Sequence, residues 1–313
     1  MSEDSGLRMG KSPVSRSSGW GGAPLGDQVI EQHVATSDVE LFVRMAGGAG
    51  RARTAVLLHG GPGLTHHYMV PLQRRLASDT LRVLCFDQRG AGASTRPETH
   101  CYGMGAYVSD LESLRAWLGI GSWIVLGHSW GGLIAQAYAA AYPQHVVALV
   151  LVSSMSPHAD DNRLAQSRFV KRLQELTEQG RILSPLRDNA TDDCRATTLA
   201  LLPAYFGDPD TPVAPELLHT GCRVSVHRAT IRMLHPYDFA SELRALHAPA
   251  AVIVGERDPF GTDCAIAVAE ALQHVSPTVE ILPRVGHFPW LEEPATLDRV
   301  DAIVRELLRD DAP

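Results

Sequence analysis

The sequence contains almost no lysine, since Lys11 and Lys171 are its only two. Long apolar runs are missing as well: nowhere do about 18 consecutive apolar residues occur, the length that a membrane-spanning helix needs. Residues 1–28 are rich in Gly and Ser and lack the hydrophobic stretch of a secretory signal. We therefore expect a cytoplasmic protein without a membrane partner, in which residues 1–28 form a flexible tail.

The five cysteines are odd in number, widely spaced and form no Cys-x-x-Cys pair. This spacing favours neither a disulfide framework nor a zinc site. A net charge of −7 argues against nucleic acid as a partner, because binding phosphates requires a basic surface. We expect no metal and no organic cofactor, and a small molecule or short peptide as the partner. The sequence leaves the oligomeric state open.

Short β-branched runs alternate with longer amphipathic stretches along the chain. This rhythm is typical of an α/β protein with a mostly parallel central sheet and helices on both faces. The predicted strands are Val39–Arg44, Ala55–His59, Arg82–Asp87, Trp123–Gly127, Val147–Val152, Ala251–Gly255 and Val279–Leu282. The predicted helices are Tyr68–Ala77, Tyr107–Leu118, Gly131–Tyr142, Cys264–His274 and Ala295–Arg309.

The rhythm stops after Val152 and resumes at Ala250–Gly255. The intervening segment has no buried-strand run, and several prolines interrupt its helical pattern. We predict a helical cap over residues 156–235, inserted into a catalytic domain formed by residues 29–155 and 236–313.

The segment Gly127–Gly131 reads Gly-His-Ser-Trp-Gly and lies between an apolar strand and a helix. Glycines around a serine permit a strand-to-helix turn that is too sharp for side chains. The turn lifts the serine oxygen clear of the sheet and near the helix N-terminus, whose dipole favours developing negative charge. The pattern predicts Ser129 as a nucleophile; an incidental serine in a glycine-rich turn is the alternative.

His59-Gly60-Gly61-Pro62-Gly63 follows another predicted strand, about 70 residues before the serine turn. A glycine-rich loop at the end of a strand supplies backbone N–H groups that can point at an oxygen. With such a serine turn, the donors of an oxyanion hole are the residue after the nucleophile and a residue of this loop. We predict Trp130 and Gly61 as these donors, and a bracing role for His59.

A nucleophilic serine requires a base, and the base requires an orienting carboxylate. Asp258 follows the strand ending at Gly255, and His287 follows the strand ending at Leu282. Both therefore lie at the same edge of the predicted sheet as the serine, in the order Ser, Asp, His that accompanies this turn. We predict His287 as the base and Asp258 as its orienting acid, with Glu256 and Asp263 as the nearest competitors of Asp258.

Two further polar features are expected to be structural. The loop Asp87–Ser94 reads Asp-Gln-Arg-Gly-Ala-Gly-Ala-Ser, but no suitable helix follows it, which argues against a dinucleotide site. We expect Asp87 and Arg89 to hold this loop by hydrogen bonds. His128 adjoins the predicted nucleophile and is expected to pack or to brace a loop.

Three motifs, His-Gly-Gly-Pro-Gly, Asp-Gln-Arg-Gly-x-Gly-x-Ser and Gly-x-Ser-Trp-Gly-Gly, together resemble those of the prolyl aminopeptidases, or proline iminopeptidases, which are serine hydrolases of the α/β-hydrolase fold. The resemblance covers about residues 30–153 and 236–310. It implies a triad of Ser129, Asp258 and His287, with Gly61 and Trp130 as oxyanion donors. It also implies release of an N-terminal residue from short peptides.

The cap departs from that family pattern. The cap helix of the family usually carries a Trp-Glu pair, whose glutamate holds the α-ammonium group of the substrate. The segment Val224–Thr230 places Val226 and His227 at these positions. An imidazole beside Arg228 would not attract an ammonium ion, because like charges repel. Another carboxylate of the cap could replace the glutamate, and the candidates are Glu175, Glu178 and Glu216. Of these, Glu175 and Glu178 fit the solvated face of an amphipathic helix. We predict substrate contacts from His227, Tyr205, Phe206 and Trp290, with a place in the core as the alternative for each aromatic.

Three functions remain open at this point. The first is a prolyl-aminopeptidase-like hydrolase of an amide or peptide bond. The second is an ester, lactone or other acyl hydrolase whose cap fits a substrate without a free amine. The third is a receptor or an acyl-transfer or cyclisation enzyme. A pure receptor is disfavoured because it would have no need to keep the three predicted triad residues together.

Overall fold

The computed structural model describes residues 28–48, 52–182, 191–234 and 236–309. Nearly all of the predicted tail, residues 1–28, lies outside these ranges. The described chain forms a sheet of eight strands in the order β1-β2-β4-β3-β5-β6-β7-β8. The strands are β1 (Val29–Ala35), β2 (Glu40–Ala46), β3 (Arg53–Leu58), β4 (Leu81–Phe86), β5 (Trp123–His128), β6 (Val146–Val152), β7 (Ala250–Gly255) and β8 (Thr278–Leu282).

The sheet is parallel from β4 to β8, whereas β2 pairs antiparallel with both β1 and β4. Every residue of β4, β5 and β7 is buried, as expected of parallel strands covered on both faces. The carboxyl ends of the parallel strands therefore meet at one edge of the sheet, where loops can gather functional side chains.

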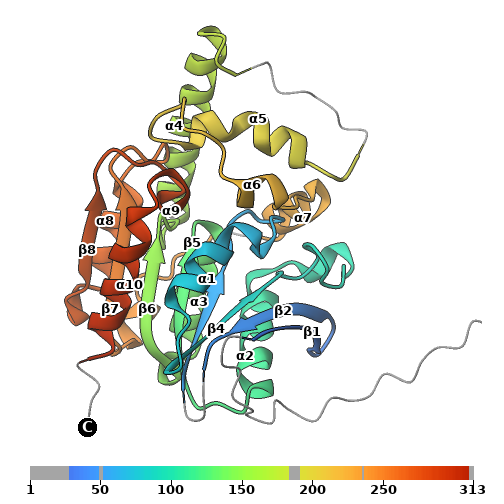
Figure 1. Ribbon diagram of the computed structural model, residues 1–313, viewed down its shortest axis with the longest axis vertical. Coiled ribbons are helices and arrows are strands. Elements are labelled where there is room, and N and C mark those ends of the chain that lie inside the picture. Colours follow the sequence, from blue (N-terminus) through green and yellow to red (C-terminus); the bar gives the residue numbers. More distant parts are fainter. Residues whose placement is uncertain (1–27, 49–51, 183–190, 235, 310–313) are drawn as a thin grey trace, which may run out of the picture.

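Helices cover both faces of the sheet (Figure 1). They are α1 (Val70–Leu76), α2 (Met104–Trp117), α3 (Trp130–Ala141), α4 (Ala159–Glu178), α5 (Arg195–Tyr205), α6 (Pro215–His219), α7 (Val224–Met233), α8 (Asp263–Ala271), α9 (Pro289–Glu292) and α10 (Ala295–Leu307). α1 and α10 contribute Leu72 and Val300 to one core cluster. α2, α3 and α8 contribute Leu111, Leu133 and Val268 to the cluster on the opposite face. The predicted α/β class is confirmed.

All seven predicted strands are present, but the prediction missed β1. This strand lies at the edge of the sheet, and most of its residues are exposed or half-buried. It reads Val-Ile-Glu-Gln-His-Val-Ala, so its exposed face carries polar residues and it lacks a continuous apolar run. An edge strand held mainly by a hairpin partner gives a weaker sequence signal than a strand buried on both faces.

Between β6 and β7 the chain forms α4 to α7, and Figure 1 shows these helices beyond the carboxyl ends of the strands. The exact limits of the predicted cap, residues 156–235, stay a prediction. Among the described residues, no helix combines the length and apolar character needed to cross a membrane.

The structure contradicts the expectation that the cysteines form no disulfide. Cys194 and Cys222 are bonded to each other, with their Cα atoms 5.0 Å apart. A short backbone pairing brings them together: the N–H of Cys194 donates to the carbonyl of Cys222 at 3.2 Å, and Asp193 pairs with Arg223. No local pattern in the sequence indicates this disulfide, because it depends on the path of the chain around α5 and α6.

The loop Asp87–Ser94 is held by buried charges, as expected. Arg89 is 1% exposed and donates to both carboxylate oxygens of Asp110 at 2.8 Å, and it also reaches Asp38 at 3.2 Å. Asp87 accepts two backbone N–H groups at 3.0 Å. Burial acts to lower the pKa of Arg89, but its bonds to Asp110 and Asp38 outweigh this and raise that pKa above its ordinary value.

We expect Arg89→Met to lower the free energy of unfolding by ~3–5 kcal/mol, because it leaves Asp110 buried without its partner. Urea denaturation at neutral pH measures the loss. Arg299→Met is the control, since the pair of Arg299 with Glu280 lies at the surface and contributes only ~0–1 kcal/mol. Similar small losses in both variants would contradict this assignment.

Candidate active site

The turn after β5 places Ser129 in an unusual backbone conformation. Its φ is 55° and its ψ −121°, and α3 begins at the next residue. A Cβ atom on Gly127 would lie 2.3 Å from the carbonyl oxygen of Gly131, and one on Gly132 would lie 2.3 Å from the Ser154 hydroxyl. A positive φ at a serine costs of order 1–3 kcal/mol and needs surrounding structure to maintain it. The glycines of the motif are thus required by space, as the sequence predicted.

The three predicted triad residues form one hydrogen-bonded chain. His287 Nε2 lies 2.9 Å from Ser129 Oγ, and His287 Nδ1 lies 2.9 Å from Asp258 Oδ2. Because a carboxylate only accepts, Nδ1 carries the proton and Nε2 is free to accept the serine proton. His287 and Asp258 are 3% and 7% exposed, whereas Ser129 is half-buried. The geometry thus allows Ser129 to be deprotonated by a base that a buried carboxylate orients.

Asp258 is selected over its competitors by its position in the loop after β7. Its second oxygen accepts the N–H of Phe260 at 3.0 Å, which fixes the carboxylate plane. Glu256 instead accepts the N–H of Arg284, and Asp263 pairs with Arg168. Neither competitor is bonded to the imidazole of His287.

The glycine-rich loop after β3 lies directly beside the serine. A Cβ atom on Gly60 would lie 3.1 Å from Ser129 Cβ, and one on Gly131 would lie 2.3 Å from the carbonyl oxygen of Leu58. Gly61 has a φ of 132°, which is a conformation that residues with side chains rarely adopt. Trp130 is the first residue of α3, so its N–H has no acceptor within the helix. Trp130 therefore adjoins the serine, and Gly61 follows the glycine that packs against it; their role as oxyanion donors stays a prediction.

His128 connects the glycine-rich loop with the loop of His287. Tyr68 Oη accepts the Gly60 N–H and lies 2.8 Å from His128 Nδ1, so its own proton points at that nitrogen. His128 Nε2 then carries the ring proton and donates to the backbone carbonyl of His287 at 2.7 Å. Complete burial lowers the pKa of His128 well below its ordinary value, which keeps the ring neutral. The bracing role expected of His128 is confirmed.

His59 braces the same loop from the other side. Its Nδ1 donates to the Gly60 carbonyl at 2.8 Å, and its Nε2 accepts the N–H of Gln88 at 3.1 Å. The Gln88 amide in turn donates to the His59 carbonyl at 2.6 Å and accepts the indole N–H of Trp130 at 3.0 Å. Burial lowers the pKa of His59 to about 4, so this ring too is neutral at pH 7.

Aromatic rings surround the imidazole of His287. The rings of Phe260 and Tyr205 lie 4.8 and 5.6 Å from it, and Phe169 lies 4.5 Å from Tyr205. Burial, together with the nearby Asp258 charge, raises the pKa of Tyr205 to about 12. Sequence reasoning missed Phe260 and Phe169. For Phe260 a signal existed, since it follows the predicted acid by two residues; for Phe169, on α4, there was none.

Two of the aromatics predicted to contact substrate lie in the core instead. Phe206 and Trp290 are each 1% exposed. Trp290 donates its indole N–H to the Tyr68 carbonyl at 2.9 Å, and Phe206 packs edge-on against Phe288. Phe206 adjoins Tyr205, but it follows the end of α5 with an extended backbone, and it belongs to the core cluster that also contains Phe288 and Trp290. The core alternative is correct for these two residues.

His227, the cap residue at the position of the expected glutamate, lies next to the glycine-rich loop. The N–H of Arg223, one turn earlier, donates to the Gly63 carbonyl at 3.0 Å, and the backbone of Pro62 in the same loop acts to raise the pKa of the His227 ring. The pKa of His227 is lowered, because neighbouring residues shield its ring from water and because the positive charge of Arg228 lies nearby. Val226 is buried against Gly90. At this position the cap thus presents an imidazole in place of the expected carboxylate, beside the predicted oxyanion loop.

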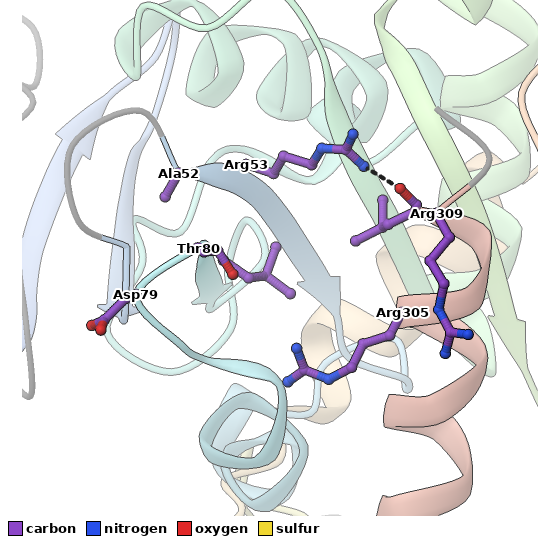
Figure 2. A pocket seen from close by; sticks show the side chains of 8 residues that line it. Ala52, Arg53, Asp79, Thr80, Arg305 and Arg309 are labelled. Atoms are coloured by element: carbon purple, nitrogen blue, oxygen red, sulfur yellow. Dashed lines mark hydrogen bonds between the residues drawn. The ribbon is translucent and has the colours of Figure 1, made fainter. Parts of the chain in front are cut away.

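A cavity of about 670 Å³ opens at the amino ends of the parallel strands, where β3 and β4 begin (Figure 2). Arg53, Arg305 and Arg309 surround it, and Arg53 donates to the Leu308 carbonyl at 2.9 Å. Because β3 begins at Arg53 and ends beside the serine, this cavity and the triad lie at opposite ends of one strand. Among the described residues, no group of three or more His, Cys, Asp or Glu side chains is arranged to hold a metal.

We expect Tyr68→Phe to destabilise the protein by ~1–3 kcal/mol, because the buried Gly60 N–H and His128 Nδ1 each lose their partner. Chemical denaturation gives the value. Tyr142→Phe, which removes a half-buried hydroxyl at the far end of α3, is the control and is expected to cost less than ~1 kcal/mol. Equal stabilities of Tyr68→Phe and wild type would show that the hydroxyl does not support the loop.

The buried neutral histidines make stability depend on pH. The pKa of His59 is about 4 in the folded state, whereas an unfolded histidine has a pKa of about 6.5. Between these two pH values the unfolded chain binds more protons than the folded one. The free energy of unfolding therefore decreases as the pH is lowered, by up to about 1.4 kcal/mol per pH unit for each such histidine. We expect His59→Gln to show a shallower decline than wild type from pH 6.5 to 4.5 in urea denaturation. Parallel declines would contradict the burial of a neutral His59.

Known proteins share this architecture. The family model described as alpha/beta hydrolase fold matches residues 55–184. A proline iminopeptidase from Lactobacillus delbrueckii subsp. bulgaricus is 27% identical over 303 residues, which cover 90% of this chain and 97% of the relative. The crystal structure of a proline iminopeptidase from Mycobacterium smegmatis aligns with a TM-score of 0.67 and 21% identity, covering 90% of this chain and 100% of the other. The crystal structure of a membrane phospholipase A aligns with a TM-score of 0.66 and 23% identity, covering 91% of this chain and 87% of the other. The chain therefore has the α/β-hydrolase fold and resembles the proline iminopeptidases.

Proposed function

We propose that this protein is a serine hydrolase that cleaves an amide or peptide bond of a small substrate through an acyl-enzyme. The observation that carries the proposal is the hydrogen-bonded chain from Ser129 through His287 to Asp258, at the carboxyl edge of the sheet. Its similarity to proline iminopeptidases, which extends over 90% of the chain, supports the amide bond as the first candidate.

The proposed mechanism follows from the positions of these groups. His287 Nε2 takes the Ser129 proton as the oxygen attacks a carbonyl carbon, and Asp258 stabilises the resulting imidazolium. The N–H groups of Gly61 and Trp130 hold the oxyanion, and the loss of one such donor typically costs ~10²–10³-fold in turnover. His287 next protonates the leaving group. It then takes a proton from the water that cleaves the acyl-enzyme and returns that proton to Ser129.

A second candidate is hydrolysis of an ester or lactone without a free amine. It is favoured by His227, which lies beside the glycine-rich loop where the family resemblance implies a glutamate. An imidazole there offers no negative charge to an ammonium group. The rings of Phe169, Tyr205 and Phe260 near His287 suit an apolar acyl group instead. Acyl transfer or cyclisation would use the same acyl-enzyme with another nucleophile in place of water.

The proposal is tested by comparing proline-β-naphthylamide, its N-acylated counterpart and a short-chain p-nitrophenyl ester as substrates, with Ser129→Ala as the control. We expect wild type to hydrolyse the free-amine amide and Ser129→Ala to lose at least ~10³-fold in turnover, since the nucleophile is gone. A small substrate as partner and a cytoplasmic location are parts of the proposal that this assay leaves to other measurements.

The other outcomes separate the candidates. If only the ester or the N-acylated amide reacts, the second candidate replaces the first, and His227 marks the change of substrate. If wild type and Ser129→Ala are equally inert on all three compounds, both hydrolase candidates fail and a non-hydrolytic role takes their place.

A further inference from the structure

A single carboxylate outside the triad holds the loop that carries His287. Glu292, the last residue of α9, accepts three backbone N–H groups. One carboxylate oxygen lies 2.7 Å from the N–H of Gly286 and 2.7 Å from that of Gly207, and the other lies 2.9 Å from that of Phe288. Hydrogen bonds to an ionised acceptor are about twice as strong as neutral ones. Glu292 therefore connects three backbone positions through one charged group.

Two of these positions flank the proposed base directly. Gly286 and Phe288 precede and follow His287, and the backbone of His287 itself is bonded on both sides. Its N–H donates to the Tyr205 carbonyl at 2.9 Å, and its carbonyl accepts the ring N–H of His128 at 2.7 Å. Every backbone N–H from Gly286 to Phe288 thus has a named acceptor, which determines where the imidazole stands.

The third position belongs to the segment after α5. Gly207 follows this helix by two residues, so Glu292 ties the segment Tyr205–Gly207 to the His287 loop. The two backbones are in close contact: a Cβ atom on Gly286 would lie 2.4 Å from the Gly207 nitrogen and 2.5 Å from the Tyr205 carbonyl oxygen. No side chain fits between these two backbones. The carboxylate of Glu292 accepts the N–H groups of Gly207 and Gly286 from beside the contact.

The same segment is held from α4 by Arg172. Its guanidinium donates to the Ala204 carbonyl at 3.0 Å and also to the Phe206 carbonyl, and its charge is attracted by Glu292. Glu292 itself is half-buried. The pKa of Glu292 is raised above its ordinary value, because burial outweighs the three N–H groups, which act to lower it. Arg172 thus donates to two backbone carbonyls of this short segment, and Glu292 accepts one of its backbone N–H groups.

We propose that Glu292 is a positioning residue that holds the His287 loop against the segment Tyr205–Gly207, so that the imidazole reaches Asp258 and Ser129 together. The inference rests on the proposed function for its kinetic consequence. Its structural part, the placement of the imidazole, does not depend on which bond is cleaved. The matched control is Glu293, the next residue, whose side chain is exposed.

The decisive variant is Glu292→Gln. Glutamine keeps the size of the side chain, but one of the two oxygens becomes an NH₂ group that only donates. Whichever way the amide turns, at least one of the three N–H groups then faces a donor. We expect the turnover number on the best substrate, and the rate of phosphonylation of Ser129 by a fluorophosphonate, to fall at least ~10-fold, because small misplacements of a catalytic group are costly. KM should change less than ~2-fold, and Glu293→Gln should match wild type in both rates.

A spectroscopic measurement separates this inference from the proposed function. In wild type the His287 proton bonded to Asp258 should give a low-field ¹H resonance that is absent from Asp258→Ala. We expect Glu292→Gln to shift or broaden this resonance and Glu293→Gln to retain it, whether or not any substrate is cleaved. An unchanged resonance with wild-type phosphonylation in Glu292→Gln would overturn the inference. A rate loss that merely follows the unfolded fraction, seen by circular dichroism, would also overturn it. Failure of wild type to react with the fluorophosphonate would count against the proposed function, and the resonance would then decide the inference alone.

Discussion

The close approach of backbones around Ser129 is the constraint on which the rest of the site depends. The first turn of α3 lies so near the end of β3 that a Cβ atom on Gly131 would stand 2.3 Å from the Leu58 carbonyl oxygen. The glycine-rich loop that continues β3 is therefore placed beside the serine by contact between backbones, which does not depend on the side chains of the loop. The strained backbone of Ser129 lies two residues before this contact, and such strain persists only where the surrounding structure maintains it.

The loop of His287 is placed by the same means at the other side of the site. Gly255 at the end of β7 approaches Gly286 so closely that a Cβ atom there would lie 2.2 Å from the Gly286 carbonyl oxygen. Polar side chains then complete what the backbones begin, with His128 joining the loops of Ser129 and His287 and Glu292 joining the latter to the cap segment. A base that must contact both an acid and a serine gains from such preorganisation, because no reorganisation is needed during reaction.

Features that follow from local patterns could be predicted from the sequence. The turn around Ser129 depends on glycines that lie within a few residues of the serine. Asp258 and His287 each lie a few residues after the end of a strand, so their places also follow from local sequence. The parallel sheet then brings these strand ends to one edge, so the triad geometry follows from topology. The edge strand β1 was missed because its polar residues and exposure weaken the apolar signal that reveals buried strands.

Features that depend on the path of the cap could not be predicted in this way. The bond between Cys194 and Cys222 spans 28 residues, and the bond from Gly207 to Glu292 spans 85. Whether Tyr205 or its neighbour Phe206 faces His287 depends on where α5 ends, and boundaries are the least certain part of any sequence reading. In the proposed function the choice of substrate depends on these same cap residues, and His227 and Tyr205 are placed only by the fold of the segment between β6 and β7. This is why the sequence indicates the chemistry of the triad more sharply than the compound on which it acts.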